Sequence, residues 1–233
     1  TSLTSVTIPN IVTAIGNDAF SGNTSLYTVA IPSGVVTIGS SAFNGCLGLR
    51  NVILPNTLVE IGSYAFSNCI NILQIDIPDS VVTIEYYAFN NCRNLQHVLL
   101  SNELKYLGYA AFKSCISLTE ITIPKSLDEG SCNWHLVPEH GIFNGSGLSS
   151  VKWEDGTTQV VSNLFLGCSA LKTVEIPETV TVIESGSFAY SGLENITIPN
   201  AVTEIGDYAF LVCDSLRSVD ISDSVTTINY ATF

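Results

Sequence analysis

Phenylalanine occurs at one position of a repeating unit and nowhere else in this chain. The 233 residues include ten phenylalanines, and successive ones are 22 or 23 residues apart except across one insertion. An ordinary globular core does not space one aromatic residue this way, whereas a stack of equivalent units does. We therefore expect a single repeat domain over residues 1–233. The phenylalanines are Phe20, Phe43, Phe66, Phe89, Phe112, Phe143, Phe165, Phe188, Phe210 and Phe233.

The stretch 49–69, LRNVILPNTLVEIGSYAFSNC, shows the unit Leu-x-x-Val-x-Ile-Pro-x-x-Val-x-x-Ile-Gly-x-x-Ala-Phe-x-x-Cys. Its Val-x-Ile part alternates apolar and polar residues, which predicts a half-buried strand. The proline has no N–H and should end that strand. The second apolar pair, as in Val12 and Ile15, is too short for a free helix and predicts a brief extended or bent segment. The glycine permits a turn, and Ala-Phe closes the coil in one irregular, 3-10 or helical turn.

Stacking should bring equivalent parts of successive units together. Strands one coil apart are expected to pair in parallel, about 4.7 to 4.9 Å from each other. Each phenylalanine ring should lie over the previous one, which predicts a continuous buried spine. Repeats 6 and 8 lose one residue just after the phenylalanine, which should tighten a turn and leave the spine intact.

The unit resembles the repeat of BspA-type leucine-rich repeat proteins, LxxVxIPxxVxxIGxxAFxxC, over essentially the whole chain. This resemblance implies a right-handed solenoid of ten coils, with a parallel β-sheet on the concave side and short irregular, 3-10 or helical turns on the convex side. It also implies a secreted or cell-surface protein, in several relatives an adhesin for host proteins. The chain contains no methionine, and we expect it to be a segment of a longer protein.

Composition and motifs exclude several function classes. Eight basic and 21 acidic residues give a net charge of -13, which repels phosphate backbones, so no nucleic-acid partner is expected. No stretch approaches the roughly 18 to 20 uninterrupted apolar residues of a membrane-spanning helix. The sequence has no nucleophile elbow and no glycine-rich phosphate loop. We therefore predict no catalytic residues and no cofactor.

Six of the seven cysteines follow the phenylalanine by three residues. Stacked neighbours would have Cα separations inside the ~4.4 to 6.8 Å window of a disulfide, but equivalent side chains in a stack point the same way. Cys168 and Cys213 have no cysteine in an adjacent coil. Buried free thiols are the favoured prediction, and occasional oxidised pairs are the alternative.

Two neighbouring repeats depart from the pattern. Repeat 6 carries eight extra residues between Pro124 and Phe143, an insertion at about 125–142. Repeat 7 has Trp153, Glu154 and Thr157 where Ile, Pro and Val are expected. These two repeats should form the irregular part of the molecule.

The insertion holds the only cluster of metal-type ligands, Cys132, His135 and His140, in C-x2-H-x4-H spacing. A zinc site usually has a second well-spaced pair of ligands, which is missing, so we predict no metal. One interpretation is a surface loop whose Trp134 folds back on the coil edge. The other is a protruding contact loop formed by Trp134, His135 and His140.

The outward strand positions that flank the Val differ from unit to unit and are the candidate binding positions. Most are small or polar. Repeats 2 to 5, however, place apolar residues on or beside a surface that stacking leaves exposed to solvent. The alternative is scattered exposed apolar residues without a role. The predicted binding residues on the concave face are Tyr27, Ile53, Leu73, Asp76, His97, Leu99 and Glu120.

The leading functional prediction is an extracellular or cell-surface module whose concave face binds a protein partner, in adhesion to a host extracellular or surface protein. A structural spacer that displays another domain is the alternative. A metal site or an enzyme at the repeat 6 insertion is the third hypothesis. The first and last units carry no polar cap, so either caps lie outside this segment or the ends pack on another copy, which would give end-to-end self-association.

Overall fold

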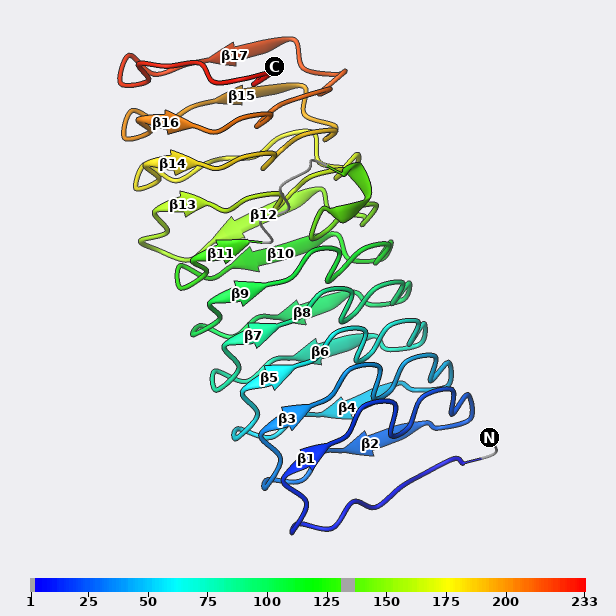
Figure 1. Cartoon of the computed structure of the whole chain (residues 1–233). Coiled ribbons are helices and arrows are strands. Elements are labelled where there is room, and N and C mark those ends of the chain that lie inside the picture. The colour runs from blue at the N-terminus through cyan, green and yellow to red at the C-terminus, as the bar shows by residue number, and fades with distance from the viewer. Residues whose placement is uncertain (1–2, 131–136) are drawn as a thin grey trace.

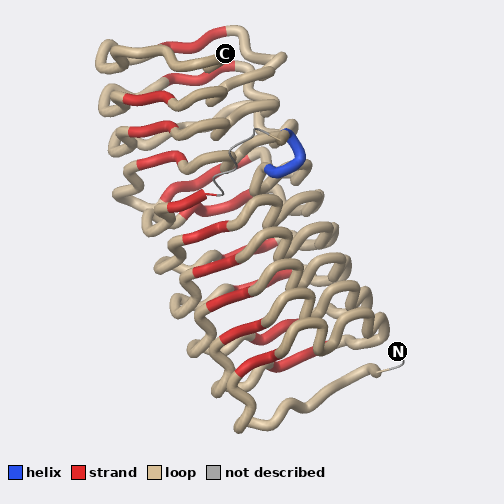
Figure 2. Tube along the Cα trace, in the orientation of Figure 1, coloured by secondary structure: helices blue, strands red, loops and turns tan. Residues whose placement is uncertain are grey.

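The chain winds into a stack of flat coils (Figure 1). The computed structural model describes residues 3–130 and 137–233. The ten phenylalanines mark about nine turns of a parallel-strand solenoid. The blue N-terminal coils and the red C-terminal coils lie at opposite ends of the stack. Within the described ranges the only helix is the short 3-10 segment η1 (Pro138–His140), and most of the chain is turn and loop between short strands (Figure 2).

The Val-x-Ile part forms a strand in eight of the ten units, as predicted, and in repeat 1 only Ser5 makes an isolated bridge to Thr28. These strands pair in parallel as β2 with β4, β6 with β8, β10 with β12 and β15 with β17. We call their outward side the first-strand face. Residues 171–176 of repeat 8 form no strand. The strands are β2 (Thr28–Ala30), β4 (Asn51–Ile53), β6 (Gln74–Asp76), β8 (His97–Leu99), β10 (Glu120–Ile123), β12 (Ser150–Trp153), β15 (Asn195–Thr197) and β17 (Ser218–Asp220).

The second apolar pair forms a second set of strands, two residues each, which confirms the predicted extended segment. These strands form two sheets. The longer sheet has six strands in the order β1-β3-β5-β7-β9-β11, and the shorter sheet has three in the order β13-β14-β16. The break falls at the insertion, where the Gln159 amide donates to the carbonyls of Leu127 and Asp128 at 3.4 and 2.9 Å. The strands are β1 (Ala14–Ile15), β3 (Thr37–Ile38), β5 (Glu60–Ile61), β7 (Thr83–Ile84), β9 (Tyr106–Leu107), β11 (Glu129–Gly130), β13 (Gln159–Val160), β14 (Val182–Ile183) and β16 (Glu204–Ile205).

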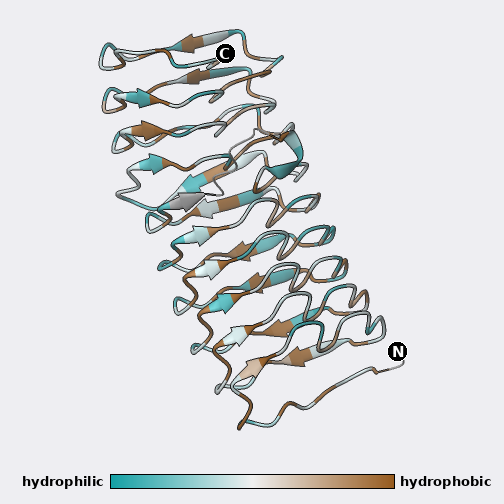
Figure 3. Ribbon diagram, in the orientation of Figure 1, coloured by the Kyte–Doolittle hydropathy of each residue, from teal (hydrophilic) through white to brown (hydrophobic). Residues whose placement is uncertain are grey.

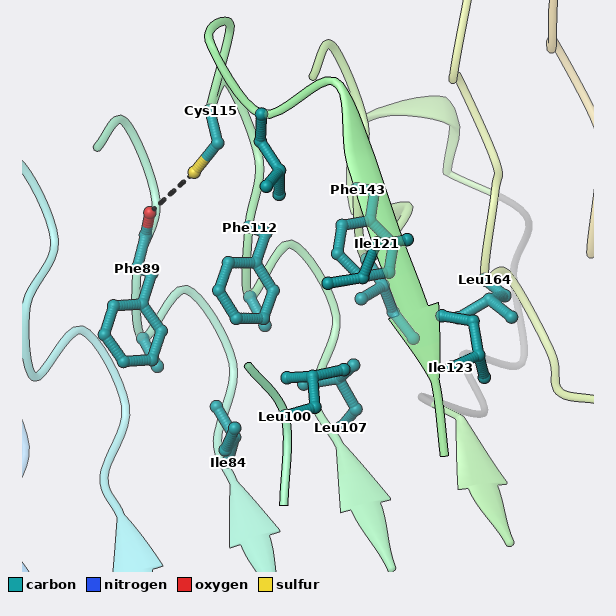
Figure 4. Close-up of a cluster of buried hydrophobic side chains, with 14 of the residues drawn as sticks. Ile84, Phe89, Leu100, Leu107, Phe112, Cys115, Ile121, Ile123, Phe143 and Leu164 are labelled. Atoms are coloured by element: carbon teal, nitrogen blue, oxygen red, sulfur yellow. Dashed lines mark hydrogen bonds between the residues drawn. The ribbon is translucent and has the colours of Figure 1, made fainter. Parts of the chain in front are cut away.

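The predicted phenylalanine spine runs through the interior between the two sets of strands. Successive ring centroids are 5.1 to 5.5 Å apart, except for 6.3 Å between Phe143 and Phe165, directly after the insertion. Eight of the ten rings are fully buried. In Figure 4 the rings of Phe89, Phe112 and Phe143 form a row, with Ile121 of β10 beside them. Figure 3 shows the matching alternation of hydrophobic and hydrophilic residues along each coil.

The segment around each phenylalanine is a run of turns, without the 3-10 or helical turn that was among the expected forms. The residues two before and two after the phenylalanine have φ between 48° and 75°, except Gly141 at -55° beside the insertion. This left-handed conformation aims the N–H groups of Ser41, Phe43 and Gly45 at carbonyl oxygens of the next coil, each 2.8 Å away. A left-handed residue other than glycine costs about 1 to 2 kcal/mol, which these bonds between coils offset.

The glycine that follows the second strand has a different role from the one predicted. Gly62 and Gly108 do not adopt positive φ. A Cβ on Gly108 would lie 2.4 Å from the backbone nitrogen of Tyr86, and one on Gly62 would lie 2.8 Å from the carbonyl of Ile38. These glycines therefore allow the backbones of adjacent coils to approach each other. Gly16 is an exception, since nothing lies within 4 Å of its Cβ position.

The six described cysteines are free and buried, which confirms the favoured prediction. Each thiol donates to the carbonyl oxygen of the phenylalanine one coil earlier, at 3.1 to 3.4 Å; Figure 4 shows the bond from Cys115 to Phe89. Burial raises the pKa of Cys115 and of Cys168 to about 12. The thiols are therefore small buried donors, and their chemistry as nucleophiles is suppressed. Cys132 lies outside the described residues.

Repeat 7 keeps its place in the stack despite its unusual residues. The Trp153 ring meets Phe165 edge-on at 6.0 Å, and its Nε1–H donates to the carbonyl of Glu175 at 2.8 Å. Glu154 accepts the backbone N–H of Lys125 at 3.0 Å and pairs with its ammonium at 3.1 Å. The backbone hydrogen bond is the main reason that the pKa of Glu154 is lowered. Polar contacts between coils thus replace the proline turn here.

Candidate functional site

Three of the predicted binding residues form one column on the first-strand face. The pairing of β2 with β4 places Ile53 opposite Ala30, and that of β6 with β8 places Leu99 opposite Asp76. Ile53 and Asp76 hold the same position in successive units. The side chains of Ile53 and Leu99 are 63% and 60% exposed, and Asp76 is also exposed.

Asp76 separates the two apolar residues of this column. Strands one coil apart lie about 4.8 Å from each other, so Ile53 and Leu99 are roughly 10 Å apart with the carboxylate between them. A continuous apolar patch is therefore absent from the column. Its shape instead suits a partner with two apolar contacts and a donor or cation at the centre.

Tyr27 and Leu73 lie beside this column, just before the strands of repeats 2 and 4, and are 52% and 47% exposed. Arg50 of the coil between them places its guanidinium carbon 5.6 Å from the centroid of the Tyr27 ring. This cation–π contact orders the tyrosine without covering it. The edge of the first-strand face thus presents an aromatic ring, a cation and a leucine in successive coils.

His97 and Glu120 occupy the other outward position of their strands, and both are exposed. His97 lies opposite Gln74. The Glu120 carboxylate pairs with the Lys152 ammonium at 2.8 Å, with both side chains more than half exposed. Such a pair contributes about 0 to 1 kcal/mol. Five of the seven predicted residues thus occupy outward strand positions of the first-strand face, and Tyr27 and Leu73 lie at its edge.

The same face is polar beyond the insertion. The column that holds Ile53 and Leu99 continues with Lys152, Glu175, Thr197 and Asp220. A depression of about 570 Å³ lies there, lined by Thr173, Glu175 and neighbours from repeats 9 and 10, where repeat 8 has no strand. The lining also includes the apolar residues Val174, Ile176, Ile196 and Val219. Among the described outward strand positions, the large exposed apolar side chains are Ile53 and Leu99, both before the insertion.

The predicted contact loop is described in part. Trp134 and His135 lie outside the described residues. His140 ends η1, and its ring lies 4.8 Å from that of Tyr109. The neighbouring Glu139 pairs with Lys113 at 3.2 Å. His140 therefore belongs with residues of the turn after the second strand and is not among the residues of the first-strand face.

A cluster of tyrosines on that turn is the feature that the sequence reasoning missed. Tyr64 stacks on Tyr87 at 4.8 Å, and Tyr86 stacks on Tyr109 at 5.1 Å. The two stacks are perpendicular, with the rings of Tyr87 and Tyr109 5.3 Å apart at 85°. Burial raises the pKa of both of these phenols. The signal was present, because these tyrosines stand two and three residues before the phenylalanine in three successive units.

Metal-binding side chains do not cluster in the described part of the chain. No group of three or more His, Cys, Asp or Glu side chains there could hold a metal ion. Cys132 and His135 of the candidate ligand set lie outside it.

The described ranges contain no helix with the length and apolar character of a membrane span.

Comparisons with known proteins agree with this architecture. Residues 1–72, 23–132 and 139–233 match the BspA type leucine rich repeat region in six copies. A leucine-rich repeat protein from Bacteroides ovatus has a similar structure: TM-score 0.50, 24% identity, with 94% of this chain and 76% of that chain covered. The pneumococcal vaccine antigen PcpA is similar with TM-score 0.61 and 21% identity over 92% of this chain and 57% of that chain.

No curated protein matches the chain. The family and the structural neighbours are leucine-rich repeat proteins, and such repeats generally serve as protein-interaction or surface modules. The family match extends over nearly the whole sequence, in agreement with the stacked parallel coils. The chain therefore belongs to the BspA-type leucine-rich repeat family.

Proposed function

We propose that this chain is an extracellular or cell-surface interaction module whose first-strand face binds a protein partner in adhesion. The observation that carries the proposal is the column of Ile53, Asp76 and Leu99 on the face of repeats 3 to 5. Family membership supports a protein-binding role, and PcpA, a vaccine antigen, supports a surface location. The partner is expected to be a host extracellular or surface protein.

The physical basis is a preformed surface. The outward side chains project from strands whose inward residues, such as Val52 and Val98, pack against the hydrophobic core, so binding does not require the backbone to be ordered. Ile53, Leu99 and Tyr27 expose apolar area that a partner would bury, which contributes about 25 cal/mol per Å². Asp76 adds selectivity, because a partner must satisfy its charge when water is excluded.

The test compares two variants that remove exposed apolar side chains. Ile53→Ser with Leu99→Ser alters the first-strand face, while Ile116→Ser alters a side chain of similar exposure, 57%, on the turn after Phe112. Each is assayed against an array of purified host extracellular proteins. We expect the double variant to lose about tenfold or more in affinity for the partner, with Ile116→Ser unchanged. Equal binding by both variants would contradict the proposal.

The second candidate function is a spacer that displays another domain. The observation in its favour is the regular stacking of the rings along the stack, broken only by the wider step at 6.3 Å. A spacer needs no partner, so the array should then show no binding by any face of the wild-type chain. Reproducible binding by this segment alone would exclude the spacer as its sole role.

A further inference from the structure

A second candidate surface lies on the outward side of the second set of strands. A depression of about 470 Å³ spans repeats 1 to 4, and its lining includes Glu60, Ser63, Glu85 and Tyr86. None of its lining residues belongs to the first-strand face. We call this depression the Glu60–Glu85 pocket.

Two glycines contribute to the lining of this pocket. Gly39 and Gly62 occupy equivalent positions of repeats 2 and 3, where a Cβ would lie 2.5 and 2.8 Å from atoms of the preceding coil. They add no side chain of their own, and beside Gly39 the Asn17 amide oxygen accepts the backbone N–H of Ser40 at 2.8 Å. In repeat 4 the same position holds Glu85, whose side chain is half-buried.

The pocket carries negative charge that the described chain does not neutralise. Burial, and then the nearby charge of Glu60, raise the pKa of Glu85. A hydrogen bond from the backbone N–H of Tyr86 lowers this pKa but does not cancel the increase. The cationic side chains nearest along the sequence have other partners: Arg50 lies over the Tyr27 ring, and Arg93 donates to the Asn91 amide oxygen at 2.7 Å. In the next repeat, Lys105 pairs with Asp128 at 3.3 Å and Lys113 pairs with Glu139 at 3.2 Å. Among the ion pairs of the described residues none includes Glu60 or Glu85. A cation from another molecule would relieve this repulsion.

The tyrosine cluster forms one side of the pocket. Tyr86 lines it and is held by Tyr109, stacked at 5.1 Å, and by Tyr64, edge-on at 5.8 Å. Because these rings are packed against each other, they lose little conformational freedom when a partner contacts them. Half-exposed tyrosines beside unpaired carboxylates combine apolar surface with hydrogen-bond acceptors.

We propose that the Glu60–Glu85 pocket receives an arginine side chain of a protein partner, with the guanidinium between the two carboxylates and the aliphatic stem against Tyr86. The planar guanidinium forms paired hydrogen bonds to carboxylates and packs on aromatic rings, whereas an ammonium offers a compact point charge. A divalent metal ion would need about six oxygen ligands, and the pocket supplies only two carboxylates.

The probe is a capped five-residue peptide with one central arginine, titrated into the ¹⁵N-labelled chain and followed by amide chemical shifts. We expect shifts at Ser63, Tyr86 and their neighbours, weaker shifts with a lysine peptide and none with the uncharged citrulline peptide. Glu60→Gln with Glu85→Gln should weaken the arginine response about tenfold or more. The control variant Glu175→Gln with Glu178→Gln removes the same charge from the opposite part of the stack. Its response to the arginine peptide should stay within about twofold of that of the wild-type chain.

An equal loss in both double variants would show that bulk charge alone attracts the peptide and would overturn the proposal. Shifts at the same amides on addition of calcium chloride, with displacement of the peptide, would overturn it in favour of a metal site. The single variant Glu85→Gln provides a second measurement if the double variant is poorly folded. Ile53→Ser with Leu99→Ser should not change the response to the arginine peptide. The proposal for this pocket can therefore fail or succeed independently of the proposal for the first-strand face.

Discussion

The two halves of the solenoid share one interior and differ in their surfaces. In residues 20–112 successive phenylalanine rings are 5.1 to 5.3 Å apart, and in residues 165–233 they are 5.4 to 5.5 Å apart. The first half exposes Ile53 and Leu99 on the first-strand face and carries the tyrosine cluster on the turns after the second strands. The equivalent face of the second half presents Glu175, Thr197 and Asp220.

This contrast separates two kinds of constraint. Every coil buries its inward residues against the same neighbours, so the same residue type satisfies that position throughout the stack. Outward positions have no such requirement and can differ between halves without cost to the stack. The information for recognition must therefore lie in the outward residues, and here both candidate surfaces fall before the insertion.

The largest expected effect tests whether the two interiors are equivalent. Phe89→Ala and Phe188→Ala each remove a fully buried ring from between two stacked neighbours. Each should lower the free energy of unfolding by about 3 to 5 kcal/mol, measured by urea denaturation. We expect the two losses to agree within about 1 kcal/mol, because the cost depends on how far the cavity can collapse and each cavity is bounded by two stacked rings at 5.1 to 5.5 Å. A much smaller loss of stability for Phe188→Ala would show that the interiors of the two halves are not equivalent.

The close approach of coils should also be common to both halves. Gly108→Ala and Gly206→Ala would place a Cβ 2.4 and 2.6 Å from backbone nitrogens of the preceding coil. Each should lower stability by about 1 to 3 kcal/mol, seen as a lower Tm. Gly16→Ala is the control, because its Cβ meets nothing within 4 Å, and its Tm should be unchanged or slightly raised. A normal Tm for Gly108→Ala would refute the role assigned to these glycines.

The smallest effect distinguishes two glutamates at the same position of the unit. Glu85 is half-buried near Glu60 and has a raised pKa, whereas Glu184 accepts the backbone N–H and the hydroxyl of Ser162 at 2.9 and 2.6 Å. A carboxyl with a raised pKa in the folded state destabilises the fold above that pKa, and the penalty disappears as pH falls through it. Glu85→Gln should therefore raise Tm slightly at pH 7.

At a pH below the pKa of Glu85 the same substitution should have no effect, because the wild-type side chain is then already neutral. Glu184→Gln should lower stability at pH 7 by about 0.5 to 1.5 kcal/mol through its weakened hydrogen bonds. Thermal unfolding of both variants at the two pH values measures the difference. A Tm that falls for both variants at pH 7 would remove the distinction between Glu85 and Glu184.

Much of the fold follows from the period of the sequence. The recurrence of Phe66 and its equivalents predicts the buried spine, and the cysteine three residues later predicts a buried thiol, because a repeated position meets its own copy in the next coil. The alternation around Val52 predicts a strand, and the outward residues Ile53 and Leu99 are exposed as expected. These conclusions need only the spacing and the polarity of residues.

Other features depend on atoms one coil away and were not predictable from local sequence. The left-handed φ of Tyr64 and Tyr190 arises because their N–H groups donate to carbonyl oxygens of the next coil, and Gly108 is required by the close approach of the Tyr86 backbone. Asp76 interrupts the apolar column only because parallel pairing places it beside Leu99. The sequence by itself determined the repeat, the spine and which positions face outward. The tertiary structure decided which of those positions become neighbours, since contacts across 23 residues of chain are set by the stacking of coils and not by the order of residues.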